Sequence, residues 1–165
     1  MNTTLAFDLQ RQSQTNWAWA AVAVSIARFY NPRQNFTQCS LACWAFDSGN
    51  CCDNPVSPAC NKPYSLDNAL QHTFNLNITR EVALSFDEVL AQLQRARPVC
   101  VQLQWTGQSG SHLCVIYGCN NERENERTYT IADPYLGKRV VLAADFPRNY
   151  GEGGTWTHTY LTKPD

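Results

Sequence analysis

The sequence predicts an α+β domain in which a helical first part packs against an antiparallel sheet. Three observations support this prediction. Apolar residues recur at helical spacing before residue 97, they alternate with polar residues after residue 98, and no regular strand–helix–strand order is present. We therefore expect one domain over residues 1–165, with a helical lobe at about 1–97 and a barrel-like sheet lobe at about 98–165.

The first predicted helix covers residues 17–30 and is apolar nearly all round, which is typical of a central, buried helix. Asn16 stands where an N-cap is expected, because its short polar side chain can accept from a first-turn N–H. Pro32 ends the helix, since a proline disfavours helical geometry in the residue before it.

The remaining elements follow from the same periodicities. Further helices are expected at 38–46, from about residue 65, and at 86–95, where Ser85 and Glu88 form a capping box. Strands are expected at 99–105, 112–119, 128–133, 138–142 and 155–161. The polar run at 120–126 predicts a hairpin that joins the second and third of these strands.

Composition and charge exclude several classes of protein. With 13 basic and 14 acidic residues the net charge is −1, which gives no electrostatic reason to bind nucleic acid or an anionic membrane. No apolar run approaches the roughly 18 residues of a membrane span. The N-terminus lacks the basic and apolar regions of a signal peptide.

The eight cysteines indicate an oxidising compartment, in contrast to the N-terminus, which does not resemble a signal peptide. Five of them lie between Cys39 and Cys60, and we expect disulfides there, although eight cysteines allow 105 complete pairings. The other three, Cys100, Cys114 and Cys119, lie in apolar strands and are interpreted as buried free thiols. The spacing of the cysteines and histidines does not match a zinc site, and we expect no metal or cofactor.

A segment around Ala18 has the pattern of a nucleophile site without its nucleophile. The residues from Gln12 to Ala21 read Gln-Ser-Gln-Thr-Asn-Trp-Ala-Trp-Ala-Ala. A thiol at position 18 would lie in the first turn of a helix, where free N–H groups and the helix dipole stabilise a thiolate. Gln12 and the backbone N–H of residue 18 are candidates for an oxyanion hole.

The base that such a thiol needs is assigned to His112, one of three histidines. His112 follows a polar loop and begins an apolar strand, which places its ring at the rim of the sheet. Asp133 ends the next predicted strand, so a hairpin between the two strands would make these residues neighbours. Asp133 is then the group that fixes the imidazole tautomer.

These motifs resemble papain-like cysteine peptidases of the compact bacterial type, including double-glycine leader peptidases and effector peptidases of plant-associated bacteria. The resemblance rests on Asn16-Trp17-Ala18-Trp19, on the segment Gly110–Gly118 and on Ile131–Pro134, and it covers roughly residues 10–140. It implies a papain-like fold and a Cys–His–Asp triad in that chain order, with Gln12 at the oxyanion. Ala18 departs from the family, so the chain as written is expected to lack covalent peptidase activity.

Three functions remain open at this point. The first is a cysteine peptidase inactivated by a Cys→Ala change at Ala18, and the second is a natural pseudoenzyme that binds peptides or proteins. The third is an acyl-transfer enzyme, a transglutaminase or deamidase, because a thioester can be resolved by water or by an amine. In each case we expect a monomer that is secreted or delivered to a target cell. Its expected partners are a peptide or protein substrate and a cognate inhibitor or immunity protein.

Overall fold

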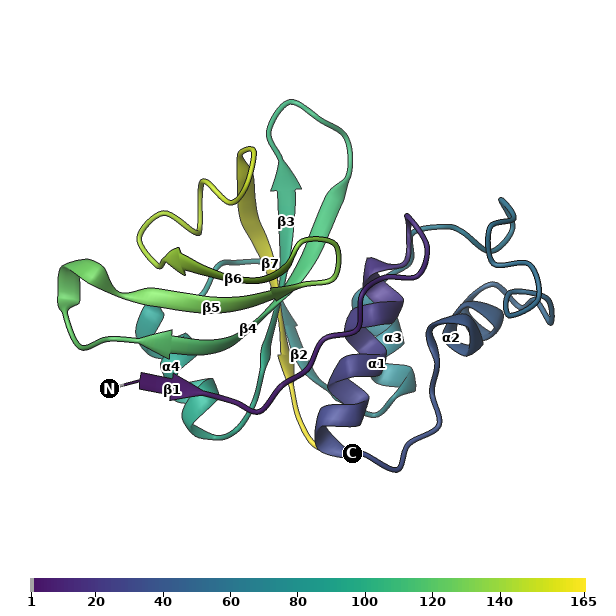
Figure 1. Cartoon of the computed structure of the whole chain (residues 1–165), viewed down its shortest axis with the longest axis horizontal. Helices are drawn as coiled ribbons and strands as arrows, with labels where there is room; N and C mark the ends of the chain where they lie inside the picture. The colour runs from purple at the N-terminus through teal and green to yellow at the C-terminus, as the bar shows by residue number, and fades with distance from the viewer. Residues whose placement is uncertain (1) are drawn as a thin grey trace.

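The first three helices gather on one side of the molecule, and the fourth lies with the strands on the other side (Figure 1), in a computed structural model that describes residues 2–165. The helices are α1 (Ala18–Tyr30), α2 (Gln38–Ala45), α3 (Leu66–His72) and α4 (Phe86–Gln94), with a 3-10 turn η1 (Glu124–Glu126). The strands are β1 (Asn2–Thr4), β2 (Leu76–Arg80), β3 (Val99–Trp105), β4 (Ser111–Asn120), β5 (Thr128–Asp133), β6 (Gly137–Leu142) and β7 (Gly154–Thr162). The predicted α+β class is confirmed.

All seven strands form one antiparallel sheet, in which six follow the order β2-β7-β3-β4-β5-β6 and β1 pairs with β4. β4 is central because β5 pairs with one of its edges and β3 with the other. Beyond Val99, where β3 begins, β1 occupies the same edge of β4, with Thr4 opposite Gly118. The hairpin of β4 and β5 that the sequence predicts is present, and it carries both His112 and Asp133.

The alternation of side chains along the strands divides the interior into two cores, one on each face of the sheet. Leu113, Val115 and Tyr117 of β4 pack with α1 and α3. Cys114 and Ile116, between them in sequence, point to the other face and pack with α4 and with the segment before β7.

Helix α1 is the centre of the first core, as its composition predicts. Nine consecutive residues, Trp19–Ala27, are buried. The expected cap is wrong, however, because the N-cap residue is Trp17 and the Asn16 side chain donates instead to the carbonyl of Asn61. A partner distant in sequence thus outcompetes the local cap.

The sheet is not confined to residues 98–165. β1 and β2 both come from the first part of the chain, and α4 packs on the sheet rather than with the other helices. The sequence analysis missed β2, a short strand between two helices in which only Leu76 and Ile78 are apolar. It also missed β1, which has only three residues and depends on β4 for its hydrogen bonds.

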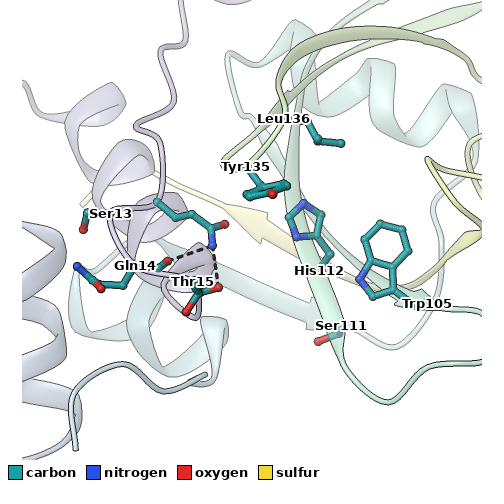
Figure 2. Close-up of a pocket in the computed structure, with 9 residues that line it drawn as sticks. Ser13, Gln14, Thr15, Trp105, Ser111, His112, Tyr135 and Leu136 are labelled. Carbon is teal, nitrogen blue, oxygen red and sulfur yellow. Dashed lines mark hydrogen bonds between the residues drawn. The ribbon is translucent and has the colours of Figure 1, made fainter. Parts of the chain in front are cut away.

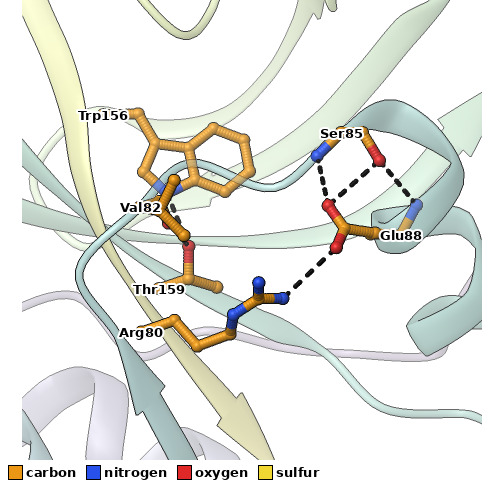
Figure 3. Close-up of polar contacts among 6 residues, drawn as sticks. All are labelled: Arg80, Val82, Ser85, Glu88, Trp156 and Thr159. Carbon is orange, nitrogen blue, oxygen red and sulfur yellow. Dashed lines mark hydrogen bonds and ion pairs between the residues drawn. The ribbon is translucent and has the colours of Figure 1, made fainter.

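Polar contacts fix the connection from β2 to α4 (Figure 3). The predicted capping box at Ser85 and Glu88 is confirmed, with each side chain bonded to the other residue's backbone N–H. Arg80 at the end of β2 forms an ion pair with Glu88, at 3.2 Å. The Thr159 hydroxyl donates to the Val82 carbonyl at 2.7 Å, which ties the connection to β7.

The expected disulfides are present between residues 39 and 60. Cys39 is bonded to Cys52, and Cys51 to Cys60. Four thiols remain free, and the interpretation of Cys100, Cys114 and Cys119 as buried thiols is confirmed, whereas Cys43 is half-buried. Within residues 2–165 no helix is long and apolar enough to cross a membrane.

Candidate active site

Position 18 is the first residue of α1, and the start of this helix is left open. The N-cap residue, Trp17, offers no side-chain cap. The other three α-helices are each capped, by the hydroxyls of Thr37, Ser65 and Ser85. The N–H groups of a first turn have no partner inside the helix, so the start of α1 retains donors and a partial positive charge beside Ala18.

The residues around Ala18 are held by three consecutive carbonyls of one distant segment. Asn16 Nδ2, Trp17 Nε1 and Trp19 Nε1 donate to the carbonyls of Asn61, Cys60 and Lys62, at 3.0, 2.9 and 3.1 Å. The Cys51–Cys60 disulfide anchors this segment. We call residues 60–62 the carbonyl ladder. It accounts for the side chains on either side of position 18 in the sequence motif.

His112 and Asp133 are in contact, as their places on the hairpin predict. Val115 pairs with Ala132, so Asp133 lies opposite Cys114. His112 is two residues from Cys114, toward the start of β4. Diagonal neighbours of this kind are within reach of long side chains. His112 Nε2 lies 2.9 Å from Asp133 Oδ2, and the Asp133 carboxylate is fully buried.

Asp133 has four partners that favour its ionised form. Oδ1 accepts from the backbone N–H groups of Tyr135 and Leu136, at 2.8 and 2.9 Å. Oδ2 accepts from the Tyr150 hydroxyl, at 2.6 Å, as well as bonding His112. Burial alone would raise the pKa of this carboxyl, but these hydrogen bonds and the charge of His112 together lower its pKa below the ordinary value. Asp133 is therefore an acceptor at neutral pH.

The imidazole of His112 is also held from the side. The Trp105 ring stacks on it with 5.7 Å between centroids and 21° between planes. Because an ionised carboxylate only accepts, the hydrogen on Nε2 points to Asp133, and Nδ1 of the neutral ring is left as an acceptor. The contacts with Trp105 and Asp133 thus fix both the plane and the tautomer of His112.

Two cavities meet at His112 and Gln12. One, of about 420 Å³, is lined by both Ala18 and His112, together with Trp19, Tyr64 and Tyr160. The other, of about 590 Å³, lies between the loop before α1 and the rim of the sheet. In Figure 2, Ser13, Gln14 and Thr15 stand on one side of it and Trp105, Ser111, His112 and Tyr135 on the other. Together they form a cleft between the helical lobe and the sheet.

Gln12 lines both cavities, but its amide is directed into its own loop. Nε2 donates to the carbonyls of Gln14 and Thr15, at 3.1 and 2.9 Å (dashed in Figure 2). Oε1 is buried and has no hydrogen-bond partner. The structure thus places Gln12 at the cleft without aiming an N–H of its side chain at a ligand.

Two residues at this site were not predicted from the sequence. Trp105 ends an alternating strand, and nothing in that pattern distinguishes a ring that covers His112 from one that faces solvent. Tyr150 lies in the irregular segment before β7, which has no periodicity to read. The remaining histidines are elsewhere: His72 stacks on Trp44, and His158 bonds Thr157.

The comparison with protein families identifies the family of this chain. The family described as "Papain-like cysteine protease AvrRpt2" matches residues 1–150. The chain belongs to this family. The comparison with curated proteins gave no match.

A solved structure agrees with the AvrRpt2 family assignment. Xylellain, a cysteine protease from Xylella fastidiosa, matches over 99% of this chain and 86% of its own, with a TM-score of 0.50 and 14% identity. At that identity the likeness shows the fold, and it confirms a papain-like architecture.

Proposed function

We propose that this member of the AvrRpt2 family is a cysteine peptidase inactivated by a Cys→Ala change at Ala18, so that it still binds its peptide substrates but does not cleave them. The observation that carries the proposal is the cavity that Ala18 shares with His112, while His112 is bonded to a buried, ionised Asp133. A base oriented in this way serves little purpose without an acid to deprotonate beside it.

With a cysteine at position 18 the steps follow from this geometry. The open start of α1 stabilises a thiolate, and Nδ1 of His112 takes the thiol proton. The sulfur attacks the peptide carbonyl, and the imidazolium then gives its proton to the leaving amine. Water hydrolyses the resulting thioester, with His112 again as the base, and the free thiol returns. Asp133 holds the ring throughout.

The oxyanion that forms in this reaction needs donors. The backbone N–H of residue 18 is one candidate, because it belongs to the first turn of an uncapped helix. Gln12 becomes the second if one of its amide hydrogens leaves the carbonyl of Gln14 or Thr15 for the substrate. Loss of one such donor typically lowers a rate by about 10²–10³.

The conformation of Gln12 also favours a second candidate, a pseudoenzyme that binds peptides in the same cleft. Its two amide hydrogens are occupied within the loop, as suits a site that holds a ligand but stabilises no oxyanion. An acyl-transfer enzyme would use the same triad and differ only in the acceptor that resolves the thioester.

The substrate class that fits is an extended peptide or a protein segment. The two cavities join at His112, and the cleft they form is lined by loop and strand residues that can bind a backbone on either side of the scissile bond. The two disulfides support a destination outside the producing cell, by secretion or delivery into a target cell. A cognate inhibitor or immunity protein would bind the same cleft.

The test restores the sulfur. Three proteins are each treated with an epoxide inhibitor of papain-like enzymes at neutral pH, and their intact masses are measured. They are Ala18→Cys, the unsubstituted chain and Ala18→Cys/His112→Ala. We expect one rapid addition to Ala18→Cys that is lost in the double variant. Equal labelling of all three would refute the peptidase site and leave the pseudoenzyme.

A second assay separates hydrolysis from acyl transfer. A peptide substrate cleaved by Ala18→Cys is incubated with and without a primary amine. Peptide products that carry the amine indicate acyl transfer, whereas free carboxylates alone indicate hydrolysis.

A further inference from the structure

Tyr150 is a buried phenol bonded to the carboxylate that orients His112. Its hydroxyl donates to Asp133 Oδ2, the same oxygen that His112 Nε2 contacts. Two hydrogen bonds therefore converge on one oxygen, while the two backbone N–H groups of the following turn occupy the other. Both oxygens of the carboxylate are thus held by directional hydrogen bonds.

We propose that Tyr150 is a positioning residue for the reaction, which holds the Asp133 carboxylate so that its Oδ2 stays aligned with His112. The proposal rests on the proposed function, since it deepens the role of the His112–Asp133 pair. Tyr150 touches neither substrate nor nucleophile in this scheme and acts through Asp133.

The backbone around Tyr150 makes the phenol a rigid donor. Tyr150 N–H donates to the Gly154 carbonyl at 3.0 Å, and Gly154 N–H donates back at 2.7 Å. A side chain at Gly154 would bring a Cβ to 3.1 Å from the Tyr150 carbonyl oxygen, so this close pairing favours glycine. The loop before β7 is thereby closed around Tyr150.

The ring is held as firmly as the backbone. It is 1% exposed and packs edge-on against Phe146, with 5.5 Å between centroids. The guanidinium of Arg139 lies 5.5 Å from the ring centroid and also forms a hydrogen bond with the hydroxyl. The Phe146 contact involves only the ring, so Tyr150→Phe preserves that packing and removes the oxygen that bonds Asp133 and Arg139.

The direction of the hydrogen bond is also fixed. Burial, and then the bond to Asp133, raise the pKa of Tyr150 well above its usual range, so the phenol keeps its proton. Asp133 has a lowered pKa and stays ionised. Tyr150 therefore donates, and Asp133 accepts, at every pH near neutrality.

Removal of the hydroxyl should act on the chemical step rather than on binding. Hydrogen bonds to a buried charge are among the stronger ones in proteins, and we expect the maximal inactivation rate to fall about tenfold or more. The inhibitor concentration that gives half the maximal rate should change less than about twofold, because Tyr150 lines neither of the two cavities around His112.

The experiment compares Tyr150→Phe with Tyr129→Phe, both in Ala18→Cys, by epoxide labelling at several inhibitor concentrations. Tyr129 is a matched control, since it is buried in the same core and packs edge-on against the same Phe146 ring. Only Tyr150→Phe should lose labelling rate. Equal rates in the two variants would overturn the proposal, whereas no labelling of Ala18→Cys itself would count against the proposed function alone.

A spectroscopic measurement on the chain as given tests Tyr150 without any catalysis. The hydrogen between His112 Nε2 and Asp133 should give a downfield nuclear magnetic resonance signal that persists in Tyr129→Phe and is lost to faster exchange with water in Tyr150→Phe. The unsubstituted chain should also show a nuclear Overhauser effect between this hydrogen and the Tyr150 hydroxyl hydrogen, because both lie on Oδ2. A visible His112 signal without that effect would refute the proposal even if Tyr150→Phe failed to fold.

Discussion

Removing the Cys51–Cys60 disulfide should release the residues around position 18, because this bond anchors the carbonyl ladder. The perturbation is the double substitution Cys51→Ala/Cys60→Ala. Its cost to stability can be worked from the loop that the bond closes. For a sequence separation of 9, the loss of chain entropy amounts to about 2.6 kcal/mol at 25 °C. For a chain of 165 residues that corresponds to a fall in Tm of roughly 5–10 °C.

The second disulfide provides a control of nearly equal cost. Cys39 and Cys52 are separated by 13 residues, so Cys39→Ala/Cys52→Ala should cost about 2.9 kcal/mol. Neither Cys39 nor Cys52 belongs to the ladder that accepts from Trp17 and Trp19. Global stability therefore changes alike in the two variants, while only one of them loses the anchor of the ladder.

The assay pairs urea unfolding with hydrogen exchange at the tryptophan indoles, which nuclear magnetic resonance resolves one by one. Exchange that requires global unfolding should accelerate equally in both variants. The indole N–H groups of Trp17 and Trp19 should accelerate further, and only in Cys51→Ala/Cys60→Ala, because their acceptors then belong to an untethered segment. Equal protection of these two indoles in the two variants would refute the reasoning.

Three further predictions concern the sheet and the thiols. Gly118→Ala should destabilise the fold by about 1–3 kcal/mol in urea unfolding, since the added Cβ would lie 2.9 Å from Thr4 Oγ1 and 3.1 Å from Thr130 Cβ. Adding Thr4→Ala to Gly118→Ala should recover part of this loss. Full additivity of the two changes in unfolding free energy would contradict this account. The pKa of Asp133 is lowered on folding, so its contribution to stability is present above the unfolded-state pKa near 3.8 and is lost as pH falls through the folded value. Asp133→Asn should therefore be less stable than the parent at pH 7, and the difference should shrink toward pH 3; a constant difference would exclude this linkage. A thiol reagent should rapidly modify only the half-buried Cys43 in the folded chain. The other three free thiols should react slowly, because burial raises the pKa of Cys100, Cys114 and Cys119. The intact mass reports the number of additions, and fast modification of two or more thiols would show that the core opens.

The parts of the site that could be predicted are those fixed by local rules. The spacing from Gln12 to Ala18 lies in one loop and one helix start, and the contact of His112 with Asp133 follows from a single hairpin. The carbonyl ladder and Tyr150 could not be predicted in this way, because no hairpin or other local pattern in the sequence places Cys60 beside Trp17 or Tyr150 beside Asp133. Asn16 failed as a cap for the same reason, since its preferred partner is Asn61 and local propensity does not encode that choice.

The absence of a side-chain cap on α1 connects these observations. An N-cap hydroxyl is worth about 1 kcal/mol, and the chain supplies one to each of its other α-helices. At α1 it places an indole instead, and that indole is used to dock Trp17 on Cys60. The first-turn N–H groups of α1 therefore have no side-chain cap, which lowers the stability of the helix and favours an anion beside Ala18.

The same region holds an ionised Asp133, whose carboxylate is bonded by His112 and by three further donors. Both features suit a thiolate and imidazolium pair, which an alanine at position 18 cannot form. These features support the proposed cysteine peptidase site, and Ala18→Cys is the single change that tests it.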